Sequence, residues 1–158
     1  MSVDLVGARH GVTMSTRWWM LLLELTMRFG WQPAGLVLFE RPEDDDGCID
    51  MTEPALGFTS PDDGHDYTGN NGYAMTAKDR MAFADAIVAA LAAVETRDAD
   101  IAKSLAAIDR CHDVDLCTEN PYASINTEEL VDAFSVPQHR DRLRQLIELA
   151  RDGEFDIC

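Results

Sequence analysis

Residues 76–94 constrain the fold most, because they carry the clearest helical pattern in the chain. Apolar side chains recur there every three or four residues, as in an amphipathic helix packed on a core. Thr76 can cap the first free N–H groups, and Asp79 puts a negative charge beside the positive end of the helix dipole. The inward stripe is expected to consist of Phe83, Ala84, Ile87, Val88, Leu91 and Val94.

Helical spacing recurs in four other segments, so the pattern predicts a mostly helical chain. The first helix begins at Ser15 or Thr16 and ends at Gly30, since glycine adopts a left-handed backbone without a steric penalty. Its Trp18 is expected to be buried, whereas Trp19, about 100° further around, is expected at the surface or at an interface. The remaining helices are expected over 98–111, 127–134 and 135–153.

Local signals in these later helices give further expectations. Thr127 is expected to cap the fourth helix. Ser135 and Gln138 match the capping-box pattern at the start of the fifth, where a proline in the first turn is tolerated. The third helix is expected to face the interior through Ile101, Leu105 and Ile108.

β-Structure is predicted to be minor. The apolar run 36–39 and a hairpin over 67–75, built on an Asn-Gly turn, favour short strands. Residues 155–158 alternate like an edge strand that would pair with either of them. Residues 1–14 show no clear period and are expected to form a loose N-terminal lead-in. The predicted fold class is therefore α+β, mostly α, with four to five helices and a small antiparallel sheet or hairpin.

Length and composition fit a single domain spanning residues 1–158. A chain of 158 residues that is 46% apolar can bury a sizeable core. The apolar run 18–23 is too short to span a membrane, and no small-residue cleavage site follows it. We therefore expect a cytoplasmic protein whose four cysteines are thiols.

The net charge of −16 narrows the class of partner. Acidic residues outnumber basic ones 29 to 13. A surface this acidic repels nucleic acid and anionic lipid, and it attracts basic proteins or cations. We therefore expect a protein partner with a basic surface, no nucleic acid and no membrane. Adaptation to high salt would produce the same composition and stays open as an explanation.

The acidity is densest in residues 40–66, which prolines and glycines mark as a long acidic loop. Loops of this length in compact domains usually carry function. The acidic side chains of this loop are therefore the candidate binding residues. They are Glu43, Asp44, Asp45, Asp46, Asp50, Glu53, Asp62 and Asp63.

Calcium is the metal that this loop would suit best. Several carboxylates fall at ligand positions of an EF-hand loop when Gly47 is aligned with the glycine of that motif. The first ligand position is Pro42, however, and the flanking residues do not show helical patterns. We expect a solvated acidic loop and no cofactor, with calcium as the alternative. The candidate metal ligands are Asp44, Asp46, Asp50 and Glu53.

Catalytic motifs are absent from the sequence. It contains no Gly-x-Ser-x-Gly elbow, no His-Glu-x-x-His helix and no phosphate-binding glycine loop. Cys111, His112 and Cys117 are close together, but a tetrahedral zinc site would need a distant fourth ligand. A binding protein is therefore favoured over an enzyme, although a dispersed Cys–His pair would leave no motif.

Three local motifs occur together in this chain. They are a Gly-Trp-x-Pro turn at 30–33, an Asn-Gly turn at 71–72 ahead of an alanine- and leucine-rich helix, and a Gly-x-Phe-x-Ile tail at 153–157. In combination they resemble a group of small, uncharacterised bacterial proteins. The resemblance implies no activity and no catalytic residue. Glu154 stands where a second glycine is expected in the tail.

These observations favour a non-catalytic, acidic, cytoplasmic protein-binding domain that recognises a basic protein surface, as an immunity or antitoxin-like factor would. Two alternatives stay open. One is a metal- or ligand-responsive domain that uses residues 43–53. The other is an enzyme with an unrecognised dispersed site.

Overall fold

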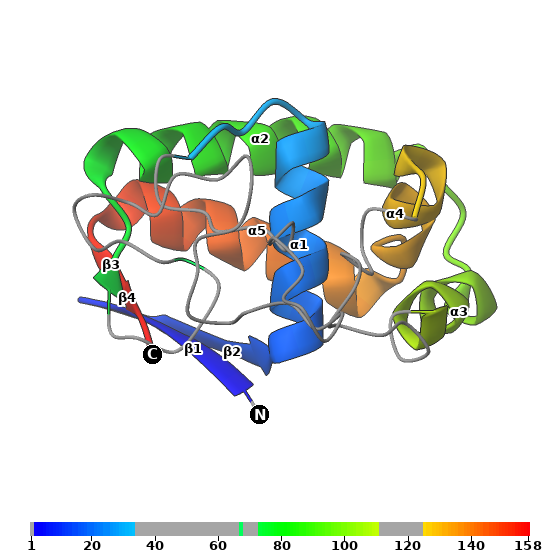
Figure 1. Ribbon diagram of the computed structural model, residues 1–158, viewed down its shortest axis with the longest axis horizontal. Helices are drawn as coiled ribbons and strands as arrows, with labels where there is room; N and C mark the ends of the chain where they lie inside the picture. Colours follow the sequence, from blue (N-terminus) through cyan, green and yellow to red (C-terminus); the bar gives the residue numbers. More distant parts are fainter. Residues whose placement is uncertain (1, 34–66, 68–72, 111–124) are drawn as a thin grey trace, which may run out of the picture.

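The computed structural model describes residues 2–33, 67, 73–110 and 125–158 (Figure 1). The described residues form five helices and a four-stranded antiparallel sheet, so the fold is α+β and mostly α, as predicted. The elements in chain order are β1 (Ser2–Gly7), β2 (Gly11–Ser15), α1 (Thr16–Arg28), β3 (Tyr73–Ala74), α2 (Ala77–Glu95), α3 (Ile101–Arg110), α4 (Thr127–Ala133), α5 (Pro137–Asp152) and β4 (Phe155–Ile157).

The N-terminal residues form a hairpin, so the expectation of a loose lead-in over 1–14 is wrong. β1 and β2 pair in register, and the Gly7 N–H donates to the His10 carbonyl at 3.0 Å to close the turn. Alternate residues of both strands are buried. The alternation of buried and exposed residues covers only a few positions in each strand, so it is a weak signal in the sequence. The strand β4, from the C-terminal end of the chain, pairs with β1 and extends the sheet. The buried residues are Val3, Leu5, Val12 and Met14.

The C-terminal strand lies inside the sheet and not at its edge. The strand order is β2-β1-β4-β3, which places β4 between the N-terminal hairpin and the short strand β3. Asp4 and Cys158 exchange backbone hydrogen bonds of 2.7 and 2.8 Å. On the other side of β4, Tyr73 pairs with Ile157. The C-terminal residues thus form a strand, as predicted. This strand pairs with β3, which is part of the hairpin expected over 67–75. The turn 68–72 and the run 36–39 lie outside the described residues.

The helices pack in a layered arrangement beside this sheet (Figure 1). α2 and α5 run side by side in opposite directions. Arg80 at the start of α2 donates to the carbonyl of Ala150 near the end of α5. At the other end, Arg144 contacts Glu95 at 2.6 Å. α1 crosses this pair, and α3 lies at the far end of the molecule from the sheet, next to α4 (Figure 1).

α1 is buried on nearly all sides, which corrects the expectation for Trp19. Every residue from 18 to 26 is buried. Trp19 is fully buried, and its Nε1 donates to the carbonyl of Tyr67 at 2.7 Å. A helix that is covered by helices and sheet on several sides has no solvent face, so helical angle alone does not decide exposure.

The helix starts predicted from local sequence are partly confirmed. The Ser15 hydroxyl accepts a hydrogen bond from the Trp18 N–H at 3.2 Å and caps α1. The Thr76 hydroxyl accepts from the Asp79 N–H at 3.2 Å and caps α2. Gly30 follows α1 with a φ of +99°, a left-handed conformation that favours glycine.

Two other helix starts differ from expectation. α4 is capped by Asn126 and not by Thr127, and Asn126 forms a reciprocal capping box with Glu129. α5 follows Val136, which provides no side-chain cap. The Ser135 hydroxyl instead donates to the carbonyl of Asp132 at 2.7 Å, at the end of α4.

α3 faces the interior with small side chains, which corrects the expectation for Ile101 and Leu105, whereas the expected inward side chain of Ile108 lies outside the described part of the structure. Ser104 and Ala107 are buried, and the Ser104 hydroxyl donates to the carbonyl of Ala133 at 2.7 Å. Ile101 and Leu105 are 68% and 54% exposed. On α2, the expected inward residue Val88 is also 40% exposed. Within the described part of the chain, no helix is both long enough and apolar enough to span a membrane.

Candidate functional site

The acidic residues that the sequence singled out lie outside the described residues. This applies to all eight candidates in segment 40–66, including the four possible calcium ligands. It also applies to Cys111, His112 and Cys117. The binding and calcium hypotheses for these residues therefore stay predictions. The candidate residues concerned are Glu43, Asp44, Asp45, Asp46, Asp50, Glu53, Asp62 and Asp63.

The structure does show how the core holds the residues on either side of segment 34–66. Trp31, shortly before it, and Tyr67, directly after it, are both buried. Their rings stack with centroids 6.1 Å apart and planes 20° apart. Stacking of aromatic rings at this distance is favourable beyond the area that it buries. The chain therefore leaves the core and returns to it at nearly the same place.

Asp79, in the first turn of α2, completes this clamp. Its backbone carbonyl accepts from Trp31 Nε1 at 2.9 Å, and its carboxylate Oδ2 accepts from the Tyr67 hydroxyl at 2.9 Å. The same hydroxyl accepts from the Thr76 N–H at 3.1 Å. Burial, together with the hydrogen bond to Asp79, raises the pKa of Tyr67 to about 12. The phenol therefore stays protonated near neutral pH and serves as a structural donor.

The net negative charge is distributed unevenly along the chain. Segment 34–66 contains ten of the 29 acidic residues, with Arg41 as its one basic residue. The described residues contain 12 of the 13 basic residues. Most of the excess negative charge therefore belongs to the segment that the clamp anchors, and not to the helices and the sheet.

Arginines on the surface of the described helices form ion pairs with nearby acidic side chains. Arg144 contacts Glu95 at 2.6 Å and Asp141 at 2.7 Å, and Arg97 contacts Glu128. The hydrogen bonds that Arg97 donates to Glu128 and that Arg144 donates to Glu95 raise the pKa values of these two arginines. Such exposed pairs add little stability. These pairs do mean that the charges of Arg97 and Arg144 are already balanced by carboxylates of the described residues.

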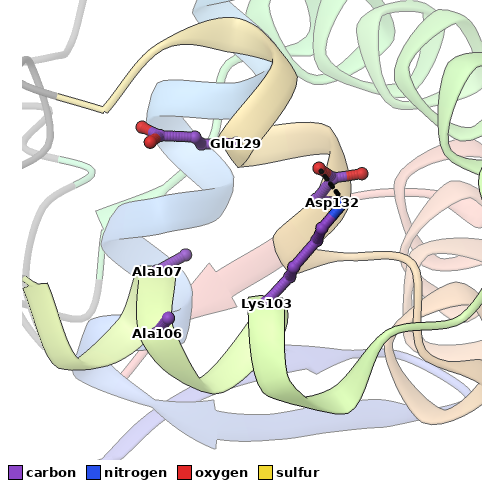
Figure 2. Close-up of a pocket in the computed structure, with 5 residues that line it drawn as sticks. All are labelled: Lys103, Ala106, Ala107, Glu129 and Asp132. Atoms are coloured by element: carbon purple, nitrogen blue, oxygen red, sulfur yellow. Dashed lines mark ion pairs between the residues drawn. The ribbon is translucent and has the colours of Figure 1, made fainter.

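Figure 2 shows a pocket of about 260 Å³ between α3 and α4. Lys103 and Asp132 point toward each other, and Lys103 Nζ lies 3.6 Å from Asp132 Oδ2. Glu129 points away from this pair (Figure 2), and Ala106 and Ala107 form the apolar wall. The described lining residues include no serine, threonine, cysteine or histidine. The lining is large enough to hold a small polar molecule.

A second hollow, of about 300 Å³, lies on the other side of α3. His139 lies in its wall, and its Nδ1 is 2.9 Å from the carbonyl of Ala133. Burial lowers the pKa of His139, and the charge of Arg142 lowers it further. The imidazole is therefore neutral near pH 7. The described residues that line this hollow are Ile101, Ser104, Leu105, Val136, Pro137, Gln138 and His139.

Sequence reasoning missed both the clamp and the second hollow. Nothing in the local pattern connects Trp31 with Tyr67, because they are far apart in the chain and meet only through tertiary packing. α3 did carry a signal. Ser104 and Ala107 are three residues apart, and small side chains at that spacing permit close approach of a neighbouring helix.

Among the described residues, no group of three or more His, Cys, Asp or Glu side chains is placed to hold a metal ion. No protein-family model, curated protein or solved structure matches the chain. The function must therefore be inferred from the charge distribution and the geometry described above.

Proposed function

We propose that this protein is a non-catalytic binding domain that recognises a basic protein surface, in the manner of an immunity or antitoxin-like factor. Residues 40–66 are its contact segment, and the helices and the sheet are the scaffold that presents it. The proposal places the protein in the cytoplasm, with thiols that stay reduced.

The observation that carries this proposal is the clamp at the base of the acidic segment. Trp31 and Tyr67 are stacked on each other and hydrogen-bonded to Asp79. Holding both ends of a loop at one place reduces the conformational freedom that binding would otherwise have to remove. The clamp therefore suits a segment that has to be displayed from a rigid base.

The charge distribution supplies the recognition chemistry. Core arginines such as Arg97 and Arg144 already have carboxylate partners. The carboxylates at 43–46 have one neighbouring cation, Arg41, and so leave a net negative charge for a partner. Complementary charge of this kind speeds association and penalises partners of the wrong sign. A basic active site or nucleic-acid-binding surface would fit such a segment.

The test begins with affinity capture from a bacterial lysate at low salt, followed by purification of the captured basic protein. Binding of the purified pair is then measured by titration calorimetry at two salt concentrations. We expect affinity to fall steeply as salt rises, because exposed charges are screened. The test variant removes three charges from the segment, by the substitutions Asp44→Asn, Asp45→Asn and Asp46→Asn.

A matched variant removes three exposed charges from the scaffold instead. We expect the segment variant to bind about tenfold more weakly and the scaffold variant to bind within about twofold of the wild type. Equal losses in both variants, or failure to capture any basic protein, would overturn the proposal. The scaffold substitutions are Glu148→Gln, Glu154→Gln and Asp156→Asn.

A further inference from the structure

The pocket between α3 and α4 contains a carboxylate whose hydrogen-bonding capacity the described residues leave unused. The Asp132 side chain is 19% exposed, and its two oxygens face two different cations. Oδ1 lies 3.8 Å from Arg97 Nη1, and Oδ2 lies 3.6 Å from Lys103 Nζ. Both distances are longer than the roughly 2.7–3.2 Å of an N–H···O hydrogen bond. A carboxylate largely removed from water normally accepts such bonds, so this one can accept them from a bound molecule.

Lys103 supplies the opposite charge at the same pocket. Its side chain extends from α3 toward Asp132 on α4 (Figure 2). An ammonium group carries three donors. Within the described chain its charged partner is Asp132, at a distance too long for a hydrogen bond. The pocket therefore presents a donor group and an acceptor group side by side, and each has capacity for a further partner.

The remaining lining limits the size of that partner. Ala106 and Ala107 form an apolar wall on α3, and Glu129 on α4 points away from the ion pair (Figure 2). The pocket measures about 260 Å³, whereas sites for drug-sized ligands measure roughly 300–1,000 Å³. A molecule that fits is therefore small, with a charged end at the ion pair and a short apolar end against the alanines.

We propose that this pocket binds a small zwitterion, namely an α-amino acid with a short aliphatic side chain. Its carboxylate accepts from Lys103 Nζ, and its ammonium donates to the carboxylate of Asp132. In an α-amino acid both groups are attached to one carbon, so a single molecule can reach both members of a pair whose atoms lie 3.6 Å apart. Charge-assisted hydrogen bonds of this kind are stronger than neutral ones.

The test compares a zwitterion with two analogues that each carry one of its charges. The probes are L-valine, isovalerate, which lacks the ammonium, and isobutylamine, which lacks the carboxylate. Binding is followed by NMR shift mapping on the labelled full-length protein. We expect valine to shift the signals of Lys103, Ala106 and Asp132. Valine should bind at least about tenfold more tightly than either analogue, because each analogue loses one charge-assisted contact.

Charge variants should change the preference among the probes in opposite directions. Asp132→Asn should weaken valine binding about tenfold and leave isovalerate binding as strong as before. Lys103→Gln should weaken both valine and isovalerate and spare isobutylamine. An unfolded variant would lose all three probes, so this reciprocal pattern separates a binding role from a structural one. Asp85→Asn is the matched control, because Asp85 forms an ion pair of 3.8 Å with Arg151 away from the pocket. It should leave all affinities within about twofold.

A change of volume tests the pocket without touching its charges. Ala106 is exposed on α3 and lines the pocket. Ala106→Leu should therefore fill part of the space and weaken valine binding several-fold. Ala89→Leu is the matched control, since Ala89 is exposed on α2 and is not among the described lining residues. Both positions are in solvent, so both variants should fold.

This site does not depend on the proposed function, because it uses none of the residues of segment 40–66. The variant with asparagine at 44, 45 and 46 should bind valine as the wild type does, even where it loses the basic protein partner. Three results would overturn the proposal for the pocket. They are an absence of shifts at millimolar valine, equal binding of the three probes, and equal losses in the Ala106→Leu and Ala89→Leu variants.

Discussion

At the scale of single residues, the hydrogen bonds around Asp79 hold together the two places where the chain leaves and rejoins the core on either side of segment 34–66. The Tyr67 hydroxyl acts as donor to Asp79 and as acceptor for the Thr76 N–H. A buried carboxylate is costly unless it is hydrogen-bonded, so the phenol does more than fill space. Tyr67 also fixes the return point of the chain next to Trp31.

Replacing Tyr67 by phenylalanine tests this role. The ring and its stacking remain, but Asp79 loses a donor and the Thr76 N–H loses an acceptor. We expect the free energy of unfolding to fall by about 1–3 kcal/mol, measured by urea denaturation. A variant as stable as the wild type would mean that water replaces the hydroxyl at no cost.

The same substitution should change the response to alkali. The pKa of Tyr67 is about 12 in the folded protein and 10.0 as its ordinary value, so the unfolded state loses the phenol proton first. The contribution of Tyr67 to stability is therefore complete below pH 10 and is lost as pH rises from 10 to 12. Urea midpoints of wild type and Tyr67→Phe should converge over that range. Parallel curves would argue against the shifted pKa.

At the scale of elements, local sequence decided where helices form better than which faces they bury. Ser15 and Thr76 cap α1 and α2 as expected, since a hydroxyl next to a helical run needs no distant partner. α3 forms where predicted but turns Ile101 outward, because α4 accepts only small side chains at the contact through Ser104 and Ala107. Helix formation is local, whereas orientation depends on the neighbour.

The start of α4 gives a direct test at this scale. Asn126→Ala removes the side-chain oxygen that accepts the hydrogen bond from the Glu129 N–H, and it should lower stability by about 1 kcal/mol. Thr127→Ala is the matched control, because Thr127 makes one exposed hydrogen bond with Arg28 at 3.3 Å. Thermal unfolding should separate the two variants. If both variants lost the same amount of stability, Asn126 would not be the dominant cap of α4.

At the scale of the whole molecule, the two ends of the chain build one sheet. β1 lies between β2 and β4, so the N-terminal residues are an inner strand of the sheet. Leu5 is fully buried in the core on the face that the helices cover, while its neighbour Val6 is 51% exposed on the opposite face. The sheet therefore cannot be completed until residues from both termini have come together.

A pair of substitutions on β1 tests this architecture. Leu5→Ala should lower the free energy of unfolding by about 2–4 kcal/mol, because it leaves a cavity in the core. Val6→Ala should cost less than about 0.5 kcal/mol, since its side chain is half in solvent. Chemical denaturation checks both. A tolerant Leu5→Ala variant would support the loose lead-in that the sequence suggested.

The sequence by itself determined the mostly helical class, a cap at Ser15 or Thr16, the cap at Thr76, the helix end at Gly30 and the strand at the C-terminus. These depend on spacing and backbone preference within a few residues. Tertiary structure alone decided that residues 2–7 form an inner strand, that Trp19 is buried, and that Trp31 meets Tyr67. Those outcomes require residues far apart in the chain to pack together, and short-range patterns carry no information about which distant residues will meet.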